Sequence, residues 1–267
     1  MCFRRVGAIV LRQFYLIRAS LSRFLPLFIW VAVDIVLWGF LTRYLNTVAS
    51  AGFNFVPALL GAVLFWDFFI RIMQGVTMAF FEDVWARNFL NIFSTPISIM
   101  EYIAGLILSS IATSSVGIVV MFVLAVTVFG LSFVSYGALV IPFLIVLFMF
   151  GIALGIAASA LVLRLGPAAE WFIWPIPAII SPFVGVLYPV TILPQWMQFI
   201  SRLLPPSYVF NCLRDIVSVR EVSWPGLLWG AGFAGLYIFL ACLFFISTYK
   251  HALRSGLIAR YSAESLS

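Results

Sequence analysis

Charged residues are scarce in this chain of 267 residues. Only 9% of the residues are Asp, Glu, Lys or Arg, whereas 64% are hydrophobic; a soluble domain carries about 25% charged residues. A water-soluble fold of this size has no way to hide so much apolar surface. The composition therefore excludes a soluble globular domain and predicts a protein whose solvent is the lipid bilayer.

Histidine, lysine and cysteine are also nearly absent. The one histidine, His251, excludes a multi-histidine metal site and a histidine-based triad buried in the membrane. The one lysine, Lys250, is followed by that histidine, whereas a phosphate-binding loop requires Gly-Lys-Ser/Thr. Cys2, Cys212 and Cys242 are far apart and suggest neither a disulfide framework nor a metal site. We therefore expect no catalytic residue, metal or cofactor in this chain, and any nucleotide must act through another polypeptide.

Residues 3–23 have the spacing of an amphipathic helix. Apolar side chains that recur every three or four residues lie on one helix face; here they are Phe3, Val6, Val10, Phe14, Ile17 and Leu21. Arg5, Arg12 and Arg23 fall roughly opposite, which predicts a helix on the membrane surface with its basic side toward the headgroups. The alternative is a charged flank of the first span. No small-residue cleavage site follows, so we expect no cleavable signal peptide.

Several apolar stretches reach the roughly 20 residues that a membrane-spanning helix needs. The predicted spans are Phe24–Leu41, Phe55–Phe80, Ile99–Phe129, Tyr136–Leu163, Trp171–Leu193 and Leu227–Tyr249. Six spans put both termini on one side of the membrane. Lys and Arg are more numerous on that side, which places both termini in the cytoplasm. We therefore attribute the net charge of +6 to the membrane topology and to contacts with anionic lipid headgroups. We expect no nucleic acid as a partner.

Prolines gather in and after the fifth span. They are Pro175, Pro177, Pro182, Pro189, Pro194, Pro205 and Pro206. Each bends or ends a helix, and broken backbone at membrane depth is tolerated only where protein or a water-filled cavity covers it. Residues 189–206 are therefore predicted to form a short re-entrant helical hairpin in the outer leaflet. The predicted fold is all-α integral membrane, with an interfacial helix, six transmembrane helices and this hairpin in one domain, residues 1–267.

Asp34, Asp67 and Arg71 lie well inside predicted spans. An ionisable side chain in hydrocarbon costs at least about 2.5 kcal/mol, so Asp34, Asp67 and Arg71 are candidates for a substrate path. Two structural alternatives stay open: Asp67 and Arg71 form an i,i+4 pair that neutralises itself, and Asp34 hydrogen-bonds to a neighbouring helix. Trp174 and Tyr188 are further candidates for the path, although tryptophans near an interface also serve as anchors.

Small residues recur in the fourth and sixth spans. Gly151 and Gly155, extended by Ala158 and Ser159, form a small-xxx-small face, and Gly226 and Gly230 begin a second one. Such faces allow helices to approach closely in a membrane. We expect packing within the chain rather than between chains.

Residues 82–96, between the second and third spans, have the pattern of a short cytoplasmic helix. Acids at its start suit the helix macrodipole, aromatic residues give it an apolar side, and Ser94-Thr95-Pro96 ends it. We interpret it as an element that docks on a cytoplasmic motor; the alternative is an interfacial helix without a partner. The residues expected to make the contact are Glu82, Asp83, Trp85, Arg87, Asn88 and Phe89.

From end to end, the chain resembles the membrane subunit of a type-2 ATP-binding-cassette exporter. The resemblance rests on the helix order, on residues 82–101, and on Tyr188-Pro189-Val190, Leu193-Pro194-Gln195-Trp196 and Leu204-Pro205-Pro206. It implies a half-transporter of the bacterial cytoplasmic (inner) membrane that homodimerises along its first and fifth spans. Two copies of a separate ATPase would bind ATP and Mg.

The resemblance also assigns roles to three segments. Residues 3–23 would be the connecting helix, residues 82–96 the coupling helix, and residues 189–206 an outer-leaflet cap. The cap residues would be Pro189, Pro194, Trp196, Pro205 and Pro206. No catalytic residue is implied.

The few charges in the spans favour a hydrophobic or amphipathic substrate: a drug, a lipid or a lipid-linked compound. A polysaccharide on a lipid carrier is the alternative, since stacked aromatic residues suit sugars. A membrane anchor or scaffold without transport, and an intramembrane enzyme in which Asp34 meets Asp67 across helices, are alternatives of other classes.

Overall fold

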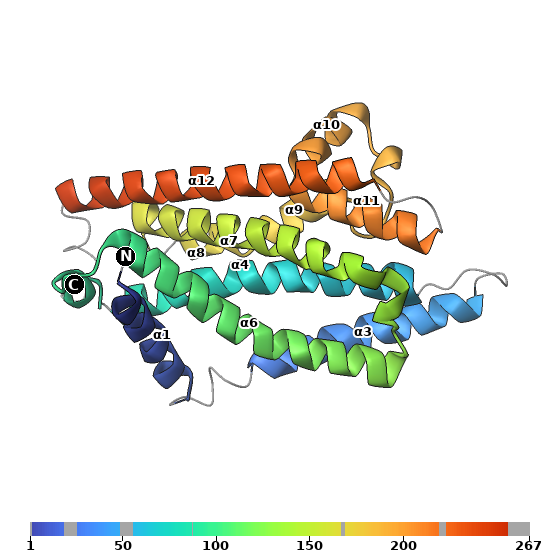
Figure 1. Ribbon diagram of the computed structural model, residues 1–267, viewed down its shortest axis with the longest axis horizontal. Coiled ribbons are helices and arrows are strands. Elements are labelled where there is room, and N and C mark those ends of the chain that lie inside the picture. The colour runs from blue at the N-terminus through green and yellow to red at the C-terminus, as the bar shows by residue number, and fades with distance from the viewer. Residues whose placement is uncertain are drawn as a thin grey trace.

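The computed structural model describes residues 2–18, 26–48, 56–86, 88–166, 169–218 and 223–255. These residues form an elongated bundle of helices (Figure 1), and the described ranges contain no strand. The longer helices are α1 (Phe3–Arg18), α3 (Pro26–Val48), α4 (Gly61–Trp85), α6 (Ile99–Phe129), α7 (Val140–Leu165), α11 (Pro205–Val217) and α12 (Trp224–Arg254). The shorter ones are α5 (Phe89–Phe93), α8 (Glu170–Ile173), α9 (Ile176–Val184) and α10 (Gln195–Leu203).

Four helical stretches of the described chain are long and apolar enough to cross a bilayer. They are Val56–Trp85, Ile99–Phe129, Tyr136–Leu165 and Trp224–Arg254, which confirms the second, third, fourth and sixth predicted spans. The first predicted span corresponds to α3, a helix of 23 residues. The total of six spans stays a prediction.

The fifth predicted span is not a continuous helix. It is divided into α8 and α9, and α9 is capped at its C-terminus by Gly185, whose φ of 70° is left-handed. Pro175 lies between the two helices, where the sequence predicted an irregular backbone. After Gly185 the chain forms a 3-10 turn, Val190–Ile192, and then α10.

The proline-rich stretch divides the outer segment into short helices. Pro194 precedes α10, and Pro205 and Pro206 open α11, where a missing backbone N–H leaves no unmade bond. Trp196 on α10 is exposed, and Pro189 precedes the 3-10 turn. Whether this segment re-enters the membrane as a hairpin stays a prediction.

Helix α7 lies at the centre of the bundle, packed against α4 and α12 (Figure 1). Its glycines make the contact with α4. A Cβ added to Gly155 would lie 2.7 Å from Cβ of Val76 and 2.9 Å from the carbonyl oxygen of Met73. The face of small residues in the fourth span therefore packs within the chain, as predicted.

Helix α1 differs in part from its prediction. The structure describes this helix as far as Arg18, and residues 19–25 lie outside the described part of the chain. Its buried face is Val6, Ile9 and Gln13, whereas Phe3 and Phe14 of the predicted apolar face are exposed. The helix is rotated because its arginines form ion pairs with α4 and α6, described below.

The two ends of the bundle are distinct. Helices α1 and α5 and the end of α12 lie at one end, and α10 and α11 lie near the other (Figure 1). A capping box, in which the side chains of Ser98 and Glu101 each bond to the other's backbone N–H, starts α6 at the first end.

The contact at Gly155 gives a stability prediction. Gly155→Ala forces a methyl group against a backbone carbonyl, so we expect a loss of about 1–3 kcal/mol, the usual cost of overpacking. Gly232→Ala in α12 is the matched control, because nothing lies within 4 Å of its added Cβ and a helical Gly→Ala change by itself stabilises by about 1 kcal/mol. Thermal unfolding of both variants in detergent measures the difference; equal melting temperatures would contradict the contact.

Candidate functional site

The acids predicted to begin a coupling helix instead end α4. Glu82, Asp83 and Trp85 lie in the last turn of this helix, and the next helix starts at Phe89. The prediction of acids at a helix N-terminus is therefore wrong. Asp83 is also fully buried, so it cannot contact a partner's surface.

The carboxylate of Asp83 holds α1 against α4. It forms an ion pair with Arg12 of α1 and accepts a hydrogen bond of 2.7 Å from the hydroxyl of Tyr102 on α6. Burial lowers the pKa of Arg12, but a guanidinium is not deprotonated in proteins, so the pair stays charged. Three helices meet at this one carboxylate.

Three further polar contacts hold α1 in place. Arg5 lies 3.4 Å from the carboxylate of Glu101, which also accepts a 2.7 Å hydrogen bond from the backbone N–H of Cys2. The side-chain amide of Gln13 donates to the carbonyl oxygen of Ala79 at 3.1 Å. Helix α1 is thereby joined to the end of α4 and to the start of α6.

The turn between α4 and α6 forms an exposed tip at this end of the bundle. Trp85 stacks on Phe81, with ring centroids 5.3 Å apart, and is still 49% exposed. The amide oxygen of Asn88 accepts a 3.0 Å hydrogen bond from the amide of Asn91. Arg87 lies outside the described residues. The exposed residues of the tip are Trp85, Ala86, Asn91, Ser94, Thr95 and Pro96.

One face of α4 remains partly uncovered from Asp67 to Trp85. We call it the open face; it consists of Asp67, Arg71, Gln74, Met78, Glu82 and Trp85. Steps of three and four residues place these side chains on one side of the helix. Most of the remaining residues of α4 are buried. A polar stripe thus runs along a helix that is otherwise apolar.

The three ionisable residues predicted inside the spans come together. Asp34 of α3 acts electrostatically on both Asp67 and Arg71 of α4. Oδ2 of Asp67 and Nε of Arg71 are buried and make no hydrogen bond to the described residues. The spacing placed Asp67 and Arg71 on one face of α4, and the fold brings Asp34 within electrostatic reach of both.

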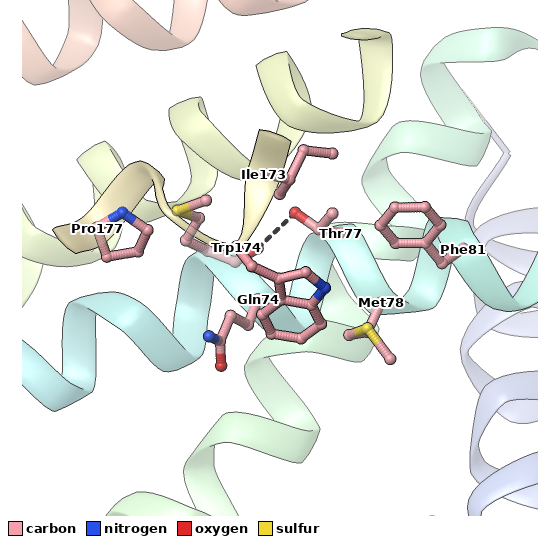
Figure 2. Close-up of a pocket in the computed structure, with 8 residues that line it drawn as sticks. Gln74, Thr77, Met78, Phe81, Ile173, Trp174 and Pro177 are labelled. Carbon is pink, nitrogen blue, oxygen red and sulfur yellow. Dashed lines mark hydrogen bonds between the residues drawn. The ribbon is translucent and has the colours of Figure 1, made fainter. Parts of the chain in front are cut away.

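A small, open cleft lies between α4 and the segment formed by α8 and α9. Figure 2 shows Trp174 between Gln74 and Met78 in this view, with Phe81 beyond. The remaining lining residues are Met73, Thr77, Ile173 and Pro177, and the hydroxyl of Thr77 is engaged with the carbonyl oxygen of Met73 at 2.9 Å. The lining carries no charge, so this cleft suits an apolar or aromatic group.

Tyr188 is not among the residues that line this cleft. It lies in the turn after α9, where its hydroxyl donates to the carbonyl oxygen of Pro182 at 2.9 Å. Arg214 of α11 donates to the carbonyl oxygens of Tyr188, at 2.8 Å, and Gly185. Burial lowers the pKa of Arg214. These bonds give Tyr188 a structural part in the turn.

The family model for ABC-2 type transporters matches residues 6–217. The chain belongs to the ABC-2 type transporter family. The match runs from within α1 to the end of α11 and so includes the ion pair of Arg12 with Asp83, the open face and the cleft. No curated protein matches the chain.

Membership of the ABC-2 type transporter family confirms the resemblance found in the sequence. The chain is a multi-pass membrane permease component, and the family implies association with a separate ABC ATPase subunit.

Sequence reasoning missed the residues that join α1 to the bundle. Arg12 was assigned to a headgroup-facing side, and Tyr102 and Gln13 were given no role. One signal in the sequence could have identified Tyr102. It directly follows Glu101 at the start of a predicted span, where a polar side chain can bond to the end of a neighbouring helix.

The ion pair between Arg12 and Asp83 predicts that Arg12 contributes more to stability than Arg5, the other paired arginine of α1. Arg12→Leu leaves Asp83 buried without its cation, so we expect a loss of about 3–5 kcal/mol of stability. Arg5→Leu should cost clearly less, because Arg5 is 43% exposed and water screens its pair with Glu101. Melting temperatures of both variants in detergent test this.

A double variant provides the control for this comparison. Arg12→Leu combined with Asp83→Leu removes both charges, so it should be more stable than Arg12→Leu alone. Equal losses for Arg5→Leu and Arg12→Leu would contradict the pairing.

Proposed function

We infer that this chain is the membrane subunit of an ATP-driven exporter, which works as a homodimer with two copies of a separate ABC ATPase. The observation that carries the proposal is the open face of α4. A polar stripe facing lipid is costly, whereas the same stripe is tolerated where it lines a water-filled or protein-covered path. A second copy of the chain covers the stripe and completes the path, with α3 and the segment α8–α9 at the seam.

The cargo is hydrophobic or amphipathic: a drug, a lipid or a lipid-linked compound. The cleft supports this choice, since its lining consists of methionine, aromatic and aliphatic side chains with Gln74 and Thr77 as polar groups. A lipid-linked polysaccharide would call for a longer row of aromatic residues to stack on sugars. The apolar cleft therefore favours export of the hydrophobic class.

The partner ATPase supplies the energy by binding ATP with Mg. It contacts this chain at the exposed tip. Trp85 is the apolar anchor of the contact, and the polar residues of the tip surround it. ATP drives transport because it favours one arrangement of the two halves over the other. Movement of the tip reaches the open face directly, because Trp85 and Asp67 belong to one continuous helix.

The tip and both termini lie on the cytoplasmic side of a bacterial inner membrane. The excess of Lys and Arg at the same end of the bundle as the tip supports this orientation. Substrate then enters from the cytoplasmic half of the membrane, and α10 and α11 cap the path at the outer end.

Removal of the indole of Trp85 tests the contact with the ATPase. Trp85→Ala should weaken binding of the ATPase about 30-fold, because a central aromatic anchor contributes about 2 kcal/mol at an interface. Trp196→Ala is the matched control, since this tryptophan is similarly exposed, at 61%, but lies on α10 near the opposite end. The partner ABC ATPase, immobilised and titrated with each variant, gives the affinities; unchanged affinity for Trp85→Ala, or equal loss for both, refutes the assignment.

The native cysteines test the orientation. Cys2 is exposed, whereas Cys212 is buried and burial raises the pKa of its thiol to about 11, so it stays protonated and unreactive at neutral pH. A membrane-impermeant maleimide should label the chain in inside-out vesicles and leave it unlabelled in intact spheroplasts. Cys2→Ser should abolish the labelling. Labelling of Cys2 from the outside would overturn the proposed topology.

A further inference from the structure

The segment that follows α9 is held by hydrogen bonds more than by packing. In the single chain none of residues 187–200 is buried, although this stretch contains the 3-10 turn and most of α10. It lies near the end of the bundle opposite α1 (Figure 1), and Trp196 and Phe199 are 61% and 64% exposed. A segment with few buried apolar contacts opens at little cost, and lids are drawn from such segments. We call residues 187–200 the outer strap.

Helix α11 holds the outer strap at both ends. At its start, the guanidinium of Arg214 donates to the carbonyl oxygens of Gly185 and, at 2.8 Å, Tyr188. Just beyond its other end, the hydroxyl of Ser207 donates to the carbonyl oxygen of Ser201 at 2.6 Å. The contact of Ser207 joins residues six apart in sequence, whereas those of Arg214 join residues 29 and 26 apart. Only the attachment at Arg214 therefore depends on how distant parts of the chain pack.

The turn that starts the outer strap fits closely around the guanidinium. Gly185 caps α9 with a left-handed φ of 70°. A Cβ at this position would lie 2.8 Å from the carbonyl oxygen of Tyr188 and 3.3 Å from a guanidinium nitrogen of Arg214. Carbonyls at the end of a helix have no N–H partner within the helix. Arg214 supplies that donor from another helix.

No acid holds the guanidinium of Arg214 in place. Its third hydrogen bond, of 3.1 Å, goes to the amide oxygen of Asn211 on the same helix. Within the described residues it forms no ion pair, and Asp215, the next residue, projects from a different side of the helix. Arg214 is also only partly buried, so water is able to replace the carbonyls. Its contact is thus easier to break than the pair of Arg12 with the buried Asp83.

We propose that Arg214 is the latch of the outer strap. While the guanidinium holds the carbonyls of Gly185 and Tyr188, the strap lies closed against the outer end of the bundle. Release of these bonds lets the strap move outward about its attachment at Ser201. This inference rests on the proposed function, in which α10 and α11 cap the path, and it names the contact that regulates opening of the cap. Arg214 acts on the cargo through the strap and does not touch it.

The reactivity of one introduced cysteine tests the latch without ATP, the ATPase or a cargo. Val186 lies between the two latched carbonyls and is 5% exposed, so Val186→Cys reacts with a water-soluble maleimide only when the turn leaves the bundle. Adding Arg214→Gln should raise the labelling rate about tenfold, the effect of about 1.4 kcal/mol. The full-length chain is labelled in nanodiscs, which leave both membrane faces accessible, and the same chain without Val186→Cys gives the background of the native cysteines.

Three further variants separate release of the latch from damage to the fold. Arg202→Gln on α10 is the matched control and should leave the rate unchanged, because its exposed side chain makes no hydrogen bond to the described residues. Arg214→Lys keeps the charge but lacks the fork that reaches two carbonyls, so its rate should be intermediate. Ala153→Cys on α7, at a position 2% exposed, reports on the fold and should stay unreactive in both Arg214 variants.

Three outcomes would refute the latch. They are an unchanged rate in Arg214→Gln, an equal rise in Arg202→Gln, and labelling of Ala153→Cys along with Val186→Cys in both Arg214 variants. The last would show that Arg214 supports the whole fold and not the strap in particular.

The partner ATPase provides a test of regulation. With the ATPase bound, ATP should raise the labelling rate of Val186→Cys when Arg214 is present and add little in Arg214→Gln, whose strap is already released. An equal ATP effect in both chains would refute regulation through Arg214. No ATP effect in either chain, with the effect of Arg214→Gln retained, would count against the proposed function and leave the latch standing.

Discussion

The close contact between α4 and α7 fixes which side of α4 stays uncovered. Helices in lipid gain little from the hydrophobic effect when they associate, so small residues and tight packing decide how they meet. Gly151 and Gly155 bring α7 against Val76 and the backbone of α4. This contact sets the rotation of α4, and the rotation leaves Asp67, Arg71 and the rest of the open face outside the core. A larger residue at the contact would turn or displace the helix and so change which side chains the bundle leaves uncovered.

The same rotation points neighbouring side chains at the end of α4 in opposite directions. Asp83 turns inward and binds Arg12 and Tyr102, whereas Trp85, two residues later, turns outward and is exposed. A buried ion pair is poor evidence of net stability, but breaking it is strongly destabilising, so it enforces one arrangement of its helices. Helix α1 therefore follows any movement of α4 and α6 at this end. A force applied at the exposed tip reaches the open face through a single helix braced by α1.

The spans, the small-residue contact and the proline breaks followed from the sequence because each is a local or strongly periodic signal. Length and apolarity identified α4, α6, α7 and α12, and spacing alone put Asp67 and Arg71 on one face. The role of Asp83 did not follow. The local rule that acids favour helix N-termini suggested that a helix begins there, but the tertiary partner Arg12, far away in sequence, stabilises the carboxylate at a helix C-terminus instead. The exposed side of α1 was misjudged for the same reason, because its arginines bind acids of other helices rather than headgroups.

By itself, the sequence determined that this protein belongs in a membrane and that its chain is helical. These properties depend on composition and on patterns of a few residues. Long apolar stretches require the bilayer as solvent, and the helical period follows from the local spacing of side chains. Only the tertiary structure decided that Asp34 joins Asp67 and Arg71, that Asp83 is internal, and that a charged region and an apolar cleft share one helix face. Those facts depend on how helices rotate against one another, and that rotation is set by contacts between residues that the chain order keeps far apart.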